Sequence, residues 1–162
     1  MQNEKQFEAT YKTHFDAIFR YIYFRLRDKE RAKDLTQETF MKTWKYMLGG
    51  GSIDSMKAFL FTVARNLILN EVERRKVHES LDLMNEEGFD IPFSELSQEK
   101  KSEFSRAMSI IAQLGSEYEE VMRLRFVEGL SIKEIAELRD EQESAVAVRI
   151  HRGLKQIKNL YQ

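Results

Sequence analysis

Basic side chains recur at every third position near the end of the chain, a spacing that suits contact with phosphate groups. These residues are Arg149, Arg152, Lys155 and Lys158. On a helix, a step of three residues places such groups along one slowly winding band. Cations in a band of this kind can neutralise the phosphates of a nucleic acid. A solvated helix face has the same composition, so the preceding segment must decide between the two interpretations.

That segment has the pattern of a helix-turn-helix. Ser131 and Glu134 have the spacing of a capping box, and Gly129 stands where a chain reversal favours positive φ. Apolar residues follow at helical spacing, first Ile132, Ile135, Ala136 and Leu138, then Val146, Ile150, Leu154 and Ile157. The opposite face of the last helix carries Ser144, Val148, His151, Arg152 and Lys155. We therefore expect this helix to enter the major groove of duplex DNA and its basic band to contact phosphates.

Two further clusters lie in the first half of the chain. Asp34, Gln37 and Glu38 share one side of a predicted helix, which is either an ordinary charged face or a surface for a partner. After the glycines at 49–51, another predicted helix carries Lys57, Phe61, Arg65 and Asn66. Aromatic and basic groups beside a flexible loop suit a single nucleic-acid strand, although aromatic residues at this spacing are more often part of a core.

The sequence contains no pattern typical of an enzyme or a metal centre. It has no cysteine, and its three histidines are scattered without ligand spacing. The glycines at 49–51 lack the Lys-Ser/Thr pair of a phosphate-binding loop. We therefore expect no catalytic residue, no metal and no cofactor.

The elements that position these groups are predicted to be helices, because the 162 residues include only one proline and seven glycines. We expect an all-α fold with two small helical domains. These are a domain at 1–76, an acidic linker at 77–101 and a helix-turn-helix domain at 102–162. The first domain is expected to hold three helices, the third capped by Asp54 or Ser55. In the second domain, Ser116 and Glu119 predict another capping box.

Charge and hydropathy limit the classes of protein to which this chain can belong. The formal net charge is −1, yet acidic residues concentrate between 79 and 103 while basic residues gather at 74–76 and at the C-terminal end. Local patches govern phosphate binding, so this balance does not exclude nucleic acid. The chain has no secretory signal pattern and no apolar run near the roughly 20 residues of a membrane span. We expect a cytoplasmic protein without membrane insertion.

Several segments, in this order, resemble the extracytoplasmic-function (ECF) group of bacterial sigma factors. DLTQETFMKTW at 34–44 resembles the family's DLxQExFxxxW helix. FLFTVARNLILNEVERRK at 59–76 resembles its FLxxIARNxxxDxxRR helix. LSIKEIAE at 130–137 and VRIHRGLK at 148–155 resemble its LSxxEIAE and VxSRLHRARK segments. The resemblance covers nearly the whole chain.

The resemblance implies a transcription initiation factor that binds core RNA polymerase and promoter DNA. The candidate surface for the clamp helices of the largest catalytic polymerase subunit comprises Asp34, Gln37, Glu38 and Thr39. The candidate residues for the melted minus-10 strand are Lys57, Phe61, Arg65 and Asn66. The candidate residues for the minus-35 duplex are Gln142, Ser144, Val148, Arg149, His151, Arg152 and Lys155. The resemblance also implies an anti-sigma factor that masks these surfaces.

The chain departs from the family pattern at the turn before the last helix. Arg139 and Asp140 replace an apolar residue and glycine, Glu141 and Gln142 replace Ile-Ser, and Ala145 and Ala147 replace Thr and Lys. An aspartate can adopt the left-handed turn, whereas the glutamates would repel nearby phosphates. These glutamates leave open an interaction protein that binds polymerase or an anti-sigma factor with weakened promoter recognition. A second alternative, which rests on the helix-turn-helix pattern itself, is a stand-alone regulator that binds duplex DNA without polymerase.

Overall fold

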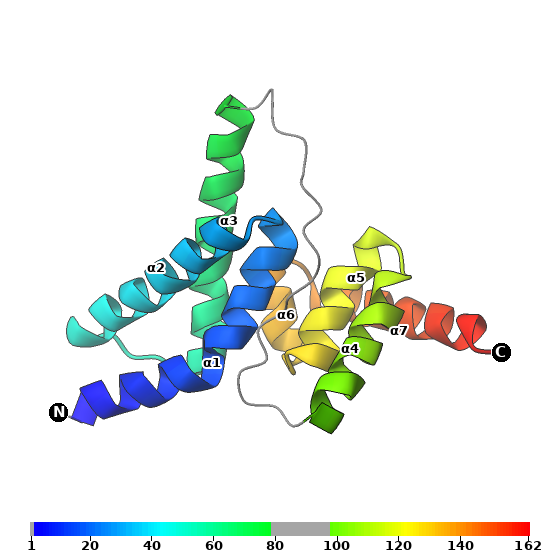
Figure 1. Cartoon of the computed structure of the whole chain (residues 1–162), viewed down its shortest axis with the longest axis horizontal. Helices are drawn as coiled ribbons and strands as arrows, with labels where there is room; N and C mark the ends of the chain where they lie inside the picture. Colours follow the sequence, from blue (N-terminus) through cyan, green and yellow to red (C-terminus); the bar gives the residue numbers. More distant parts are fainter. Residues whose placement is uncertain (1, 79–97) are drawn as a thin grey trace. The chain divides into compact units, whose positions relative to one another are not determined.

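The computed structural model describes residues 2–78 and 98–162, and its regular elements over those ranges are all helical (Figure 1). The chain divides into two compact units, Met1–Pro92 and Phe93–Gln162. The all-α fold class predicted from the sequence is confirmed. Most of the predicted acidic linker lies outside the described residues.

The first unit is a three-helix arrangement of α1 (Gln2–Leu26), α2 (Lys29–Leu48) and α3 (Met56–His78). Each of these helices packs against the other two. Their apolar faces meet in a core whose fully buried members include Ile18, Ile22, Leu35, Phe40, Leu60 and Phe61. Aromatic rings of α1 surround Phe40 of α2, with Tyr11 at 4.8 Å and Phe15 at 6.2 Å between ring centroids. Burial of these large rings provides much of the driving force that fixes the register of α2 against α1.

Local signals set the ends of these helices. Asp28 caps α2, because its Oδ1 accepts a hydrogen bond from the Arg31 amide at 3.1 Å. The helix ends at the glycines, where Gly50 has a φ of +83° that favours glycine. Ser55 caps α3, because its hydroxyl accepts a hydrogen bond from the Ala58 amide at 3.2 Å. Of the two predicted caps, Asp54 and Ser55, the structure therefore has the serine.

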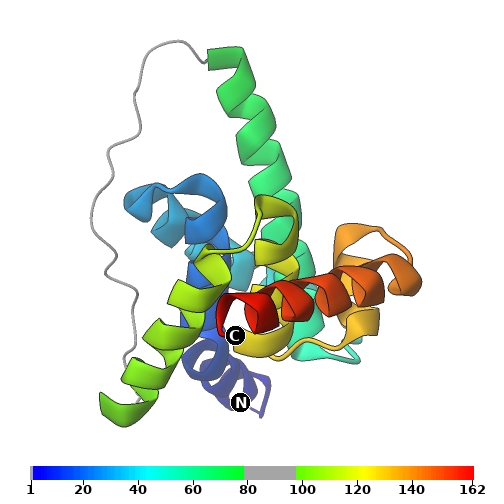
Figure 2. The same cartoon turned by 90° about the vertical axis from the view of Figure 1, so that its right-hand side faces the viewer.

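The second unit contains α4 (Gln98–Ala112), α5 (Ser116–Met122), a π-helical turn η1 (Arg123–Val127), α6 (Ile132–Arg139) and α7 (Glu143–Leu160). Figure 2 shows α7 along its length in orange and red. Both α5 and α6 pack against α7, and the core between them includes Val121, Met122, Leu124, Leu130, Ile135 and Val146. The helix-turn-helix is therefore built on a scaffold of the preceding helices.

Of the two predicted capping boxes, one is confirmed and one is wrong. Ser131 Oγ accepts from the Glu134 amide at 3.1 Å, and Glu134 Oε2 accepts from the Ser131 amide at 2.8 Å. At the start of α5, Gly115 occupies the cap position and no side chain caps the helix. Ser116 lies one residue inside the helix, so its hydroxyl is not at the position from which a cap acts.

The prediction that Leu154 of α7 lies on the buried side is wrong as well. Leu154 is 45% exposed, whereas Gly153 is buried against Met122 of α5. A Cβ atom at position 153 would lie 2.8 Å from the Met122 sulfur. The close approach of α7 to α5 is therefore centred on Gly153, and the side chain of Leu154 faces solvent.

Candidate functional site

The first candidate surface is the exposed side of α2. Asp34, Gln37 and Glu38 are exposed on this helix, as the sequence predicted. Thr39 is completely buried, and its hydroxyl donates to the Leu35 carbonyl at 2.7 Å. The expectation that Thr39 meets a partner is therefore corrected, because its side chain faces the core. The candidate surface consists of two carboxylates and one amide.

Three threonines on the inner side of α2 are buried in the first unit. Thr36, Thr39 and Thr43 are all completely buried, and each hydroxyl donates to the carbonyl four residues earlier at 2.6, 2.7 and 2.9 Å. These bonds satisfy the hydroxyl groups without a partner from another helix. These threonines therefore mark the inner side of α2, and the exposed carboxylates lie on its other side.

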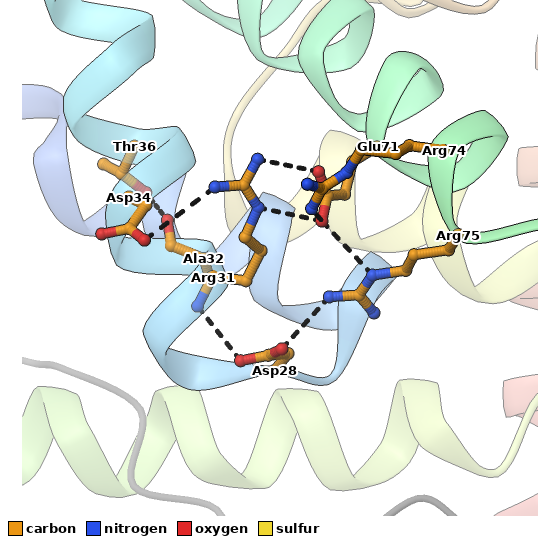
Figure 3. Close-up of polar contacts among 8 residues, drawn as sticks. All are labelled: Asp28, Arg31, Ala32, Asp34, Thr36, Glu71, Arg74 and Arg75. Carbon is orange, nitrogen blue, oxygen red and sulfur yellow. Dashed lines mark hydrogen bonds and ion pairs between the residues drawn. The ribbon is translucent and has the colours of Figure 1, made fainter. Parts of the chain in front are cut away.

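A buried carboxylate on α3 anchors the start of α2 (Figure 3). Glu71 is 4% exposed and accepts two hydrogen bonds from Arg31, from Nε at 2.9 Å and from Nη2 at 2.8 Å. It also accepts from Arg74 at 2.9 Å and from Arg75 at 3.4 Å. The hydrogen bonds from Arg31 and Arg74 overcome the opposing effect of burial and lower the pKa of Glu71 to about 2.

The same group of residues extends to the α2 cap and toward the exposed acidic side. Arg75 donates to Asp28 Oδ2 at 3.1 Å, and Asp28 is the cap of α2. Arg31 Nη1 lies 3.9 Å from Asp34 Oδ2, so one arginine lies between the buried Glu71 and the exposed Asp34 (Figure 3). We call Asp28, Arg31, Glu71, Arg74 and Arg75 the Glu71 cluster. It orients the candidate surface of α2.

The second candidate surface lies at the loop between α2 and α3. Tyr46 is 45% exposed, and its ring lies 4.9 Å from the ring of Phe59. A Cβ atom at Gly51 would lie 2.2 Å from the Tyr46 ring, so only a glycine lets the loop pass this close to the ring. The Tyr46 hydroxyl also donates to the Ser52 carbonyl at 3.4 Å. The loop is thus folded against a partly exposed aromatic pair.

The predicted minus-10 residues divide into two groups. Lys57 and Arg65 are half-buried and Asn66 is exposed, so these three polar groups are accessible on α3. Phe61 is completely buried, with its ring 5.1 Å from Tyr21 of α1. The expectation that Phe61 stacks on a base is corrected, because the ring fills the core. The accessible aromatic groups beside this loop are Tyr46 and Phe59, which sequence reasoning did not select.

Lys57 also has a neighbour on α1. Burial lowers the pKa of the His14 imidazole, and the nearby positive charge of Lys57 lowers it further. Both effects favour the neutral form of His14.

The third candidate surface is the helix-turn-helix. Asp140 has φ 52° and ψ 49°, the left-handed conformation expected for it. The Asp140 amide donates to the Glu137 carbonyl at 3.3 Å, and the Glu141 amide donates to Ala136 at 3.0 Å. These two bonds form the Schellman arrangement that ends a helix. The aspartate thus makes the turn for which the family pattern has glycine.

Most of the predicted minus-35 residues share the exposed side of α7. The exposed members are Gln142, Ser144, Val148, His151, Arg152 and Lys155. Arg149 is half-buried at the edge of this side, and its Nη1 donates to Glu141 Oε2 at 2.5 Å. The basic band of α7 is therefore not uniform, because Arg149 already has a carboxylate partner.

The glutamate in the turn belongs to a network that joins three helices. Arg139 donates to Glu141 Oε1 from Nε at 3.3 Å and from Nη2 at 3.2 Å. Arg139 also pairs with Glu120 of α5. Burial alone would raise the pKa of Glu141, but hydrogen bonds from Arg149 and Arg139 lower it below its usual value. The acidic turn is therefore partly neutralised within the protein.

Residues 2–78 and 98–162 could in principle contain two other features, a metal site or a membrane-spanning helix. Among the described residues, no group of three or more His, Asp or Glu side chains is placed to hold a metal ion. None of the helices within those ranges combines the length and hydropathy that a membrane crossing requires.

Comparison with known proteins agrees with this arrangement. Residues 10–77 match the family model for Sigma-70 region 2, and residues 105–157 match the one for Sigma-70 region 4. The chain is 28% identical to the RNA polymerase sigma factor YlaC of Bacillus subtilis, over 98% of this chain and 93% of that protein. It is 29% identical to the ECF RNA polymerase sigma factor BldN of Streptomyces coelicolor, over 95% of this chain and 60% of that protein.

A solved structure has the same fold. It is that of the sigma factor RpoE in complex with the anti-sigma factor NepR from Bartonella quintana, with a TM-score of 0.67 and 21% identity, over 97% of each chain. The two family regions match the two structural units in the same order, and the sequence relatives span nearly the whole chain. The chain belongs to the ECF group of RNA polymerase sigma factors and directs the polymerase to promoters.

Proposed function

We propose that the chain divides promoter-directed initiation among its three exposed surfaces. The acidic side of α2 binds core RNA polymerase, the loop before α3 holds the melted minus-10 strand, and α7 contacts the minus-35 duplex. The chain contributes binding and orientation rather than catalysis, and it works in the cytoplasm together with the polymerase. Two weak DNA contacts gain affinity when a polymerase scaffold holds both at a fixed spacing.

The observation that carries the proposal is the anchored acidic side of α2. Asp34, Gln37 and Glu38 are exposed on a helix whose start is fixed by the Glu71 cluster. Carboxylates presented in a fixed geometry suit a basic and polar partner surface. A stand-alone DNA-binding regulator would have no use for such a surface, since DNA repels it.

The minus-10 role rests on chemistry near the glycine loop. Tyr46 and Phe59 offer aromatic faces, while Lys57 and Arg65 offer positive charge on the adjoining part of α3. A base removed from the duplex can stack on an aromatic ring, which offsets the unstacking cost of a few kcal/mol. Asn66 adds an exposed amide that can hydrogen-bond a base edge.

The minus-35 role rests on the exposed side of α7. Gln142 and Ser144 stand at its N-terminal end, where a recognition helix contacts base edges. Arg152 and Lys155 are exposed further along the helix and supply phosphate contacts.

An anti-sigma factor is the proposed regulator. The solved relative RpoE is described in complex with such a factor, NepR. We infer that a protein of this class covers the surfaces of this chain that bind polymerase or DNA. An acidic α2 surface and a basic α7 surface would both have to be masked, which favours a partner with charges of both signs.

Binding measurements with the full chain test the proposal. A labelled chain is titrated with core polymerase, and D34N/E38Q is expected to weaken binding at least about tenfold through lost charge pairing. Glu73→Gln is the control for loss of a carboxylate charge, because Glu73 is an exposed carboxylate on α3 and is not part of the candidate surface of α2. Equal losses in both variants would contradict the proposed surface.

A DNA titration completes the test. R152A/K155A is expected to lower the slope of log affinity against log salt by about 1.8, since each lost phosphate contact contributes about 0.9. If the chain binds polymerase but R152A/K155A leaves the salt slope unchanged, the interaction-protein alternative is favoured. DNA binding without polymerase binding would favour the stand-alone regulator.

A further inference from the structure

Arg149 differs from the other basic residues of α7 because a carboxylate already holds it. Its guanidinium donates to Glu141 Oε2 at 2.5 Å, and only 29% of its side chain is exposed. Arg152 and Lys155 are exposed on the same helix. A carboxylate oxygen at this distance occupies the position that a phosphate oxygen would take in a charge-assisted hydrogen bond.

Glu141 is not free to move away from Arg149. Its other oxygen accepts from Arg139 at 3.2 and 3.3 Å. Arg139 is held in turn by Glu120 of α5. The charges thus alternate along a row of four side chains that runs from α5 through the α6–α7 turn to α7. These are Glu120, Arg139, Glu141 and Arg149. Release of Arg149 to DNA would therefore break a contact in a restrained network.

We propose that Glu141 sets the DNA affinity of α7 by occupying Arg149 in place of a phosphate. This inference rests on the proposed contact of α7 with duplex DNA. In the native chain, Arg149 contributes no phosphate contact, so sequence-independent binding is weaker than the basic band alone would give. Because such binding depends mainly on phosphate contacts, Glu141 raises the ratio of promoter-specific to non-specific binding.

Replacement of Glu141 by glutamine should release Arg149 toward DNA. One additional phosphate contact steepens the salt slope by about 0.9, so the loss of affinity between 50 and 200 mM salt grows by about 3.5-fold. Arg149→Ala alone should leave the slope unchanged, because the native Arg149 makes no such contact. In the double variant E141Q/R149A the slope should return to the native value.

The experiment is a salt series of anisotropy titrations with the full chain and a labelled duplex of mixed sequence. Glu143→Gln is the matched control, because Glu143 is an exposed carboxylate in the first turn of α7. It removes the same charge near the DNA without breaking the Arg149 contact, and it should leave the slope unchanged. Circular dichroism checks that every variant keeps its helical content.

Two results would overturn the inference. The first is that R149A alone lowers the salt slope by about 0.9, because Arg149 of the native chain would then contact phosphate despite Glu141. The second is that E143Q steepens the salt slope as much as E141Q does, because the loss of repulsion between a carboxylate and the phosphates would then explain both results. Should E141Q lose helical content, the slope of R149A alone decides the question. An R152A/K155A variant with the native slope would instead show that the proposed DNA contact of α7 itself has failed.

Discussion

Replacement of Glu71 by glutamine should destabilise the first unit and disturb the side of α2 that is proposed to bind polymerase. The change keeps the size of the side chain but removes the charge to which three arginines donate. Arg31 is affected most, because it makes two hydrogen bonds to Glu71 and is also the link to Asp34. The expected consequences are lower stability and a less fixed start of α2.

The magnitude follows from the pKa of Glu71. Its decrease from 4.5 to about 2 corresponds to roughly 3 kcal/mol of preferential interaction with the charged form. Arg31 and Arg74 are 31% and 60% exposed, so solvent screens part of this interaction. We therefore expect E71Q to lose about 2 kcal/mol of unfolding free energy.

The pH dependence has a definite sign. Because folding lowers the pKa of Glu71, its contribution is fully present above pH 4.5 and is lost as the pH falls toward about 2. E71Q lacks this titration. The stability difference between the native chain and E71Q should therefore shrink across that window.

The assay uses Trp44, the only tryptophan of the chain, which lies in the first unit with its ring 4.8 Å from Phe7. Urea unfolding followed by its fluorescence reports on this unit in the full chain. Glu73→Gln is the control, because it changes an exposed carboxylate on the same helix. A midpoint shift no larger for E71Q than for E73Q would refute the role assigned to the cluster.

Three further substitutions test the fold assignments. Phe61→Ala should cost about 3–5 kcal/mol in the Trp44 unfolding assay, because the ring is completely buried, and a surface-like cost under 1 kcal/mol would contradict its place in the core. Ser131→Ala should cost about 1 kcal/mol, measured by circular dichroism, through loss of the α6 capping box, and an unchanged unfolding midpoint would argue against that box. Asp140→Gly should raise stability by about 0.5 kcal/mol in the same assay, since glycine adopts the left-handed turn without side-chain strain, and a decrease would contradict this reasoning.

The features that could be predicted from sequence depend on neighbouring residues. The scarcity of proline and glycine predicted the all-α fold, and the Ser131 and Glu134 spacing located the start of α6. The left-handed turn at Asp140 was inferred from the glycine that the family pattern has at this position, and the structure has it there. The box at Ser116 failed because Gly115 has the extended backbone of a cap, which shifts the serine into the first turn.

The features that could not be predicted depend on tertiary packing. Arg31 and Glu71 are forty residues apart, and no local pattern pairs them. Thr39 and Phe61 have types compatible with either a surface or a core, and only the packing of three helices decides. Glu141 was expected simply to repel phosphate, whereas the turn brings it to Arg139 and Arg149.

Run-off transcription with purified core polymerase tests the central claim most directly. The native chain should produce discrete transcripts from promoter-containing genomic fragments. D34N/E38Q should reduce them because it weakens polymerase binding, and R152A/K155A should reduce them while polymerase binding is retained. A chain that binds core polymerase but yields no transcript above background from any fragment would contradict promoter-directed initiation.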